Sequence, residues 1–236
     1  MRGQSERRPR LIGVIALVVS ALVLLFVIAS LSLDEGDEGP IEITGQGAVQ
    51  QQLGGIRQQD ERLGQPGPPV TIEVFSDLQC RPCADFQREV VSPLIEGPVR
   101  DGEVKVEFHH FPMTQSGFGL ASYGAVAAAK QHHQWQFIQL FFANQREAEG
   151  RMVSQEFLDR IAGAILEFNV EQWQRDLDEP DVLETLEADD ELRAERGFPA
   201  EPALVVSGPR GSRELVESPS LEQVEEAIAG GTVSVP

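Results

Sequence analysis

The chain contains only two cysteines, Cys80 and Cys83, and two residues separate them. Frameworks of structural disulfides in small secreted folds use more cysteines at wider spacings. A pair this close can instead alternate between a disulfide and a dithiol, and so pass a disulfide to another protein. We therefore predict that the pair is a redox centre, which requires neither a metal nor an organic cofactor.

A structural zinc site is the alternative for this pair. Zinc sites of that kind take four ligands, often from two cysteine pairs. The available histidines form two adjacent pairs, His109-His110 and His132-His133, and neighbouring histidines are awkward partners around a tetrahedral ion. The pattern therefore favours redox chemistry. We interpret His109 and His110 as packed within the fold, with proton transfer near the thiols as the alternative, and His132 and His133 as solvated residues.

The cysteines lie at a predicted junction between a strand and a helix. Apolar residues alternate along Val70–Ser76, which indicates a strand, and helical periodicity begins near Arg81. Cys80 would then lie at the helix N-terminus, where the partial positive charge lowers a thiol pKa, and Arg81 adds a cation beside it. Pro82 fits the first helical turn and helps to tune the pair. Cys80 is thus the predicted nucleophile, and Cys83, one turn further, is the predicted resolving thiol.

The remaining pattern predicts the order of the elements. A second strand is expected at 104–111, a helical block at 116–196 that ends at Gly197, strands at 203–207 and 213–217, and a last helix at 220–229. Pro93 should kink or break the helix after the cysteines, and Asn169 and Asp181 should cap later helices. A βαβ unit, a helical block and a ββα unit make an α/β thioredoxin fold with helices inserted in its middle.

The residues around the cysteines resemble a known family. The stretch from Val70 through Phe75-Ser76-Asp77-Leu78-Gln79-Cys80-Arg81-Pro82-Cys83 looks like the active-site entry of the DsbA-like branch of thioredoxin-fold proteins. The likeness covers residues 55–230 and continues through Phe111-Pro112, Trp135-Gln136-Phe137, Phe157-Leu158 and Gly197. The lead-in, Gly55-Ile56 and Leu63-Gly64, is similar to that of membrane-anchored members from Gram-positive bacteria. The resemblance implies a thiol–disulfide oxidoreductase.

The resemblance also implies a proline in cis that faces the cysteines and binds the substrate backbone. In this chain that proline is Pro202, because a predicted strand follows it directly from Ala203, and Pro199 is its rival. The backbone before a cis proline is free to pair with an extended peptide, so Glu201 joins Pro202 as a predicted substrate-binding residue. A simple proline at the start of a strand is the alternative.

Three positions depart from the family pattern. The order Arg81-Pro82 between the cysteines is more similar to that of reducing thioredoxins, so the direction of exchange stays open. Val74 occupies the position where many relatives have a buried acid, and Glu73 beside it points to the other face of the strand. Glu201 would place a negative charge near Cys80 and raise the pKa of its thiol, which opposes Arg81 and the helix dipole.

Charge and hydropathy predict a domain outside the cytoplasm. The chain has a net charge of −19 and no basic stripe in its body, which argues against a nucleic-acid partner. Residues 11–33 are uncharged and long enough to cross a bilayer. Four arginines precede them and acidic residues follow, which predicts a cytoplasmic N-terminus at residues 1–10 and a transmembrane anchor. A cleaved signal peptide is the alternative, although its apolar core is usually shorter.

The predicted organisation is an anchor, a flexible spacer at residues 34–54 and a catalytic domain at residues 55–236. We expect a monomeric enzyme that donates disulfides to unfolded or reduced exported proteins and is restored by a redox partner in the membrane. A membrane-tethered reductase or isomerase is the first alternative. A non-catalytic binding or chaperone module is the second.

Overall fold

The computed structural model describes residues 19–21, 23, 42–112, 118–145, 153–215 and 218–230. The chain divides into two units, Met1–Pro40 and Ile41–Pro236. Within the first unit the four described residues are helical, and the rest of the predicted anchor and cytoplasmic N-terminus lies outside the described residues. No helix within the described ranges is long and apolar enough to cross a membrane.

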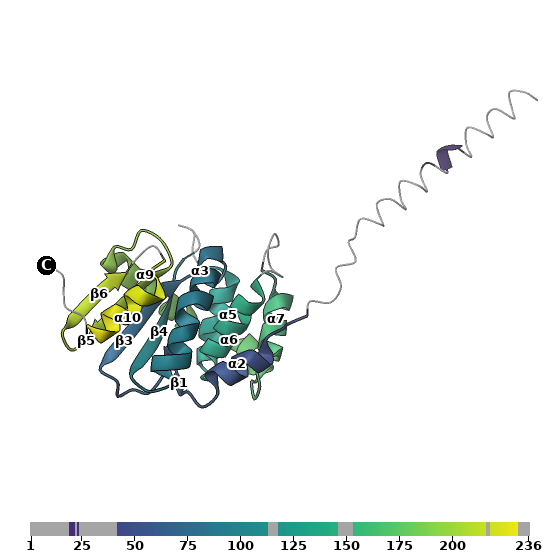
Figure 1. The fold of residues 1–236 in the computed structure, drawn as a ribbon. Helices are drawn as coiled ribbons and strands as arrows, with labels where there is room; N and C mark the ends of the chain where they lie inside the picture. Colours follow the sequence, from purple (N-terminus) through teal and green to yellow (C-terminus); the bar gives the residue numbers. More distant parts are fainter. Residues whose placement is uncertain are drawn as a thin grey trace, which may run out of the picture. The chain divides into compact units, whose positions relative to one another are not determined.

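A mixed sheet, six-stranded over the described residues, forms the centre of the second unit (Figure 1). In spatial order its strands are β1 (Gln58–Gln59), β2 (Arg62–Leu63), β4 (Val104–His110), β3 (Val70–Ser76), β5 (Ala203–Gly208) and β6 (Gly211–Leu215). Strand β3 runs parallel to β4 and antiparallel to β5. The two strands predicted on either side of the cysteines and the later hairpin are therefore confirmed.

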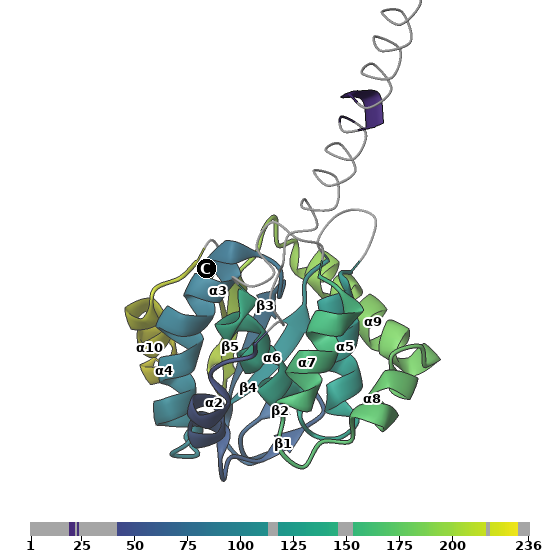
Figure 2. The same ribbon diagram turned by 90° about the vertical axis from the view of Figure 1, so that its right-hand side faces the viewer.

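Helices cover both faces of this sheet. The helical elements are α2 (Gln46–Leu53), α3 (Arg81–Phe86), η1 (Gln87–Val91), α4 (Ser92–Leu94), η2 (Ile95–Val99), α5 (Leu120–Ala129), α6 (Gln134–Ala143), α7 (Gln155–Gly163), α8 (Val170–Asp176), α9 (Pro180–Arg196) and α10 (Leu221–Ala229). Figure 2 shows α9 on the side of the sheet opposite to α4 and α10. The predicted order of a βαβ unit, a helical block and a ββα unit is confirmed for the described residues.

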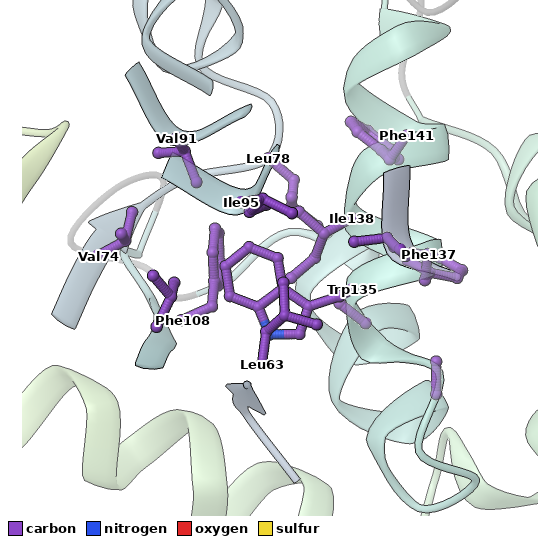
Figure 3. Close-up of a cluster of buried hydrophobic side chains, with 14 of the residues drawn as sticks. Leu63, Val74, Leu78, Val91, Ile95, Phe108, Trp135, Phe137, Ile138 and Phe141 are labelled. Atoms are coloured by element: carbon purple, nitrogen blue, oxygen red, sulfur yellow. The ribbon is translucent and has the colours of Figure 1, made fainter. Parts of the chain in front are cut away.

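The main hydrophobic core lies between the sheet and the helices that follow the cysteines and form the block (Figure 3). Leu78, from the turn before Cys80, points into this core and is fully buried. Trp135 is also fully buried, and its indole N–H donates to the carbonyl of Glu61 at 2.9 Å. The turn that carries the cysteines and the helical block therefore pack into the same core, through Leu78 and Trp135 respectively.

Of the kink or break predicted at Pro93, the break does not occur, because Pro93 lies inside α4. The helical path continues from Arg81 past Pro93, and the turns at Gln87–Val91 are π-helical. It kinks at Gly97, whose φ of −104° and ψ of −105° are not helical. In a regular α-helix Pro93 would lack its hydrogen bond and its ring would clash with the carbonyl of Glu89. The π-helical turn before Pro93 is wider than an α-helical turn and can accommodate the proline, so the helix does not end there.

The predicted helix caps are confirmed in part. The Asn169 side chain accepts a hydrogen bond from the backbone N–H of Gln172 at 3.0 Å, as an N-cap should. Asp181 is not a cap, because α9 already begins at Pro180 and its N-cap is Glu179. The Asp181 carboxylate instead pairs with the Lys130 ammonium at 2.8 Å, which is a contact between distant helices that local sequence does not reveal.

The segment predicted as a spacer contains a helix in its second half. Helix α2 buries Val49 and Leu53 against the core. Ahead of it, the Asn144 side chain accepts from the backbone N–H of Thr44 at 2.9 Å and donates to its carbonyl at 3.0 Å. The two buried apolar side chains of α2 are too few for a periodic signal, so the sequence alone does not predict its packing.

Candidate active site

The two cysteines form a disulfide at the start of helix α3, and their Cα atoms are 5.2 Å apart. Cys80 is the N-cap residue, and its Sγ accepts a hydrogen bond from the backbone N–H of Cys83 at 3.1 Å. Cys83 is fully buried, whereas Cys80 is partly exposed and the neighbouring Arg81 and Pro82 are exposed. Only the outer sulfur is open to attack by a large substrate, which agrees with the predicted assignment of nucleophile and resolving thiol.

Polar contacts hold the turn that presents Cys80. The Gln145 side chain donates to the carbonyl of Leu78 at 2.6 Å and to that of Cys80 at 3.0 Å. The Asp77 carboxylate accepts from the backbone N–H of Gln79 at 2.9 Å. Sequence reasoning missed Gln145, because a glutamine just after a helix 65 residues away carries no local signal of this contact.

The cis bond and the strand start predicted for Pro202 are both present. The peptide bond between Glu201 and Pro202 is the cis bond found among the described residues, whereas Pro199 is not in cis. Strand β5 begins directly afterwards, and its pairing sets Ala203 opposite Phe75 near the end of β3. This register places the segment before β5 at the same end of the sheet as the cysteine turn, which follows β3.

Glu201 lies beside the two sulfurs. One of its carboxylate oxygens and the Sγ atoms of Cys80 and Cys83 all lie within 4.8 Å of one another. The Glu201 side chain is partly buried, so water screens its charge only in part. The predicted proximity is confirmed, and the carboxylate opposes the partial positive charge of the α3 N-terminus.

A buried carboxyl near the site occurs at Asp77 and not at Val74. Val74 is a fully buried core residue, and Asp77 is 4% exposed. Burial raises the pKa of Asp77 to about 6, and the negative charge of Glu201 adds to that effect, although the hydrogen bond from Gln79 lowers it. Glu73 points away from the site, as predicted, and its carboxylate lies 3.4 Å from the Arg196 guanidinium. Sequence reasoning missed Asp77 as a titrating group.

The histidines of β4 are packed within the fold, as predicted. The His109 ring stacks on Phe75 with centroids 4.8 Å apart, and its Nδ1 lies 2.7 Å from the Asp189 carboxylate. Burial lowers the pKa of His109, but the hydrogen bond and charge of Asp189 outweigh that effect and raise it. His110 is fully buried, and burial lowers its pKa to about 4.

The predicted solvated position is confirmed for His132 and is wrong for His133. His132 is exposed in a turn with a φ of 60°, which agrees with the predicted solvated position. His133 is half-buried at the N-cap of α6, and its ring packs on Phe168 with centroids 5.5 Å apart.

A family model described as "Thioredoxin" matches residues 57–229. The chain belongs to the thioredoxin family. Its curated relatives include the "Probable disulfide bond formation protein D" of Bacillus cereus and that of Bacillus anthracis. Each is 24% identical over 171 residues, which cover 71% of this chain and 76% of the relative.

Solved structures confirm the predicted DsbA-like fold. Oxidised BdbD from Bacillus subtilis superposes with a TM-score of 0.64 at 20% identity, covering 74% of this chain and 95% of that one. The alpha-DsbA1 of Wolbachia pipientis superposes with a TM-score of 0.62 at 19% identity, covering 72% of this chain and 89% of that one. The thioredoxin fold with an inserted helical block is therefore established for residues that include both cysteines.

Removing the charge of Glu201 should make reduced Cys80 more reactive. A carboxylate within 4.8 Å disfavours the thiolate, so Glu201→Gln should lower the pKa of the Cys80 thiol. The rate of alkylation of reduced protein against pH, in the presence of a chelator, measures this pKa. Glu222→Gln, an exposed site on α10, is the matched control, and an unchanged or higher pKa in Glu201→Gln would contradict the assignment.

Asp77 should make the stability of the protein depend on pH. Its pKa rises from 3.8 to about 6 on folding, so the folded state binds the proton more tightly between those values. The free energy of unfolding therefore falls as the pH rises from about 4 to about 6, and that loss persists above pH 6. Asp77→Asn removes this titration and still accepts from Gln79, so it should gain up to about 3 kcal/mol relative to the wild type over this range.

Urea unfolding of the oxidised chain at a series of pH values measures the Asp77 effect. The difference between the variant and the wild type isolates this group from the other carboxylates. If the two stability curves stay parallel from pH 4 to pH 7, Asp77 does not carry the raised pKa.

Proposed function

We propose that this chain, a thiol–disulfide oxidoreductase, donates disulfides to exported proteins through Cys80 and Cys83. The observation that carries the proposal is the disulfide at the α3 N-terminus, with one sulfur accessible and the other fully buried. The relatives named as probable disulfide bond formation proteins support this direction of exchange.

The proposed reaction has two exchange steps. A client thiolate attacks Cys80 Sγ, the bond between the two sulfurs breaks, and Cys83 leaves as a thiolate. A second client thiolate then attacks the client sulfur of this mixed disulfide, and Cys80 leaves as a thiolate. The client gains a disulfide and the enzyme is left as a dithiol, which a redox partner in the membrane must oxidise again.

The α3 N-terminus favours the second step, in which Cys80 leaves. It stabilises the Cys80 thiolate as a leaving group, and Gln145 keeps the turn in place through two carbonyls. Asp77, with its raised pKa, is a nearby buried group able to accept or release a proton as the sulfurs change charge. Pro202 and Glu201 would lie along the backbone of an extended client segment.

The proposal includes a position at the membrane. The apolar residues 11–33, preceded by four arginines, support a single-pass anchor with the catalytic domain on the extracytoplasmic side. This side is oxidising, so a disulfide donor and its exported clients would meet there. The monomer that we propose needs no second copy, because both sulfurs and the proposed binding residues belong to one chain.

Replacing Cys83 should trap clients on Cys80. In cells, Cys83→Ala leaves the outer thiol without its resolving partner, so mixed disulfides with exported proteins should accumulate. Non-reducing gels of the membrane fraction, washed with alkaline carbonate, should contain these adducts. Cys80→Ala is the matched control and should trap far fewer. Adducts that fractionate with soluble cytoplasmic proteins would contradict the proposed location, and no adducts at all would contradict the mechanism.

The equilibrium reduction potential of the pair should decide the direction. A strong disulfide donor lies near roughly −120 mV and a reductant near roughly −270 mV. We expect a value closer to the donor, because the α3 N-terminus and Arg81 stabilise the thiolate of the reduced form. Equilibration with glutathione redox buffers measures it. A value at the reductant end would replace donation with reduction or isomerisation by the same residues.

A further inference from the structure

The active site brings together three potential metal ligands from two segments that are distant in the sequence. They are the two sulfurs and the Glu201 carboxylate, and their ligand atoms lie within 4.8 Å of one another. The zinc alternative considered from sequence required histidines to complete the site. In the folded protein the neighbour of the sulfurs is instead a carboxylate from the segment before β5.

We propose that the reduced protein binds a thiophilic divalent cation, with Zn²⁺ as the reference ion, through Cys80, Cys83 and Glu201. Thiolates and a carboxylate are both ordinary ligands of this ion, and three protein ligands leave a fourth position for water. Cys80 is partly exposed, so solvent reaches that position. The proposal is independent of client identity and requires only the dithiol that the proposed function generates in each cycle.

The geometry is close to what such a site needs. Metal–sulfur bonds of about 2.3 Å and metal–oxygen bonds of about 2.1 Å at tetrahedral angles require ligand atoms about 3.5 to 3.8 Å apart. Once the disulfide is reduced, the sulfurs can separate to that distance, and Glu201 needs to move by about 1 Å at most to meet it. The hydrogen bond from the Cys83 N–H to Cys80 Sγ would stabilise a metal-bound thiolate as it does a free one.

The local charge also favours a cation once the thiols lose their protons. Two thiolates and one carboxylate carry three negative charges, against about half a positive charge at the helix N-terminus. Asp77 is a further acidic group near Glu201, and Arg81 is the exposed cation beside Cys80. The ligand set therefore keeps an excess of negative charge that a divalent ion would neutralise.

Metal binding and disulfide formation would exclude each other. Binding replaces the two thiol protons with the ion and releases them to water, and no electron is transferred. The oxidised protein has no thiolate to offer, so it should not bind. An ion held by both sulfurs would also protect Cys80 from electrophiles and delay its oxidation.

The test uses the full-length chain, reduced, freed of reductant and kept without oxygen. Zn²⁺ is titrated in competition with a chromogenic chelator, and Cd²⁺ is titrated while the sulfur-to-metal absorption is recorded. We expect one ion per reduced chain, no binding by the oxidised chain, and slowed alkylation of Cys80 in the presence of Zn²⁺. Because even outer partners of metal ligands alter affinity about 10-fold or more, loss of a direct ligand in Glu201→Gln should weaken binding at least about 10-fold.

Two variants keep this test decisive. Glu201→Asp retains a carboxylate and should bind better than Glu201→Gln, whereas Glu222→Gln, exposed on α10, should bind like the wild type. The proposal is overturned if the reduced chain binds no more ion than the oxidised chain, or if Glu201→Gln binds as tightly as the wild type. Disulfide transfer to a reduced client in excess chelator tests the proposed function separately, so failure of one result leaves the other standing.

Discussion

Strand β3 pairs with β4 on one side and with β5 on the other, and this pairing determines where the residues of the active site lie. The cysteine turn leaves the end of β3, while the Glu201-Pro202 segment enters β5 beside it, because Phe75 and Ala203 are partners in the register. A shift of one residue would send the side chains of β5 to the opposite face. The approach of Glu201 to the sulfurs thus depends on long-range pairing between residues more than 120 positions apart in the chain.

Side chains packed on the face of the sheet that carries Phe75 reinforce this register. Phe75 stacks on His109 and makes an edge contact with Phe198, a residue just after the end of α9. Asp189 from α9 holds both the His109 ring and the backbone N–H of His110, each at 2.7 Å. Leaving buried polar groups of this kind unpaired would cost free energy. These hydrogen bonds therefore hold α9 against the end of β4 that lies nearest to the active site.

The sequence was sufficient where local physics decides the structure. Alternation predicted β3 and β4, helical periodicity predicted that Cys80 lies at the start of a helix, and the strand predicted from Ala203 favoured Pro202 over Pro199 as the cis proline that the resemblance implies. It failed where a contact joins distant segments. No local pattern predicts the hydrogen bonds from Gln145 to the cysteine turn, the ion pair of Asp181 with Lys130 or the packing of α2. The sequence did not predict the π-helical turns before Pro93 for another reason, since a wider turn can accommodate a proline as well as a kink or a break can.

Glu201 has opposite effects on the two forms of the reduced site. With only protons available, its charge disfavours the Cys80 thiolate and so works against the helix dipole, which lowers the capacity to donate disulfides. With a divalent cation available, the same charge completes a ligand set and favours both thiolates. A neutral residue at this position would strengthen thiolate formation but remove the third ligand. The carboxylate therefore links the reactivity of Cys80 to the metal content of its surroundings, and the partly buried position of Glu201 makes both effects larger than they would be in water.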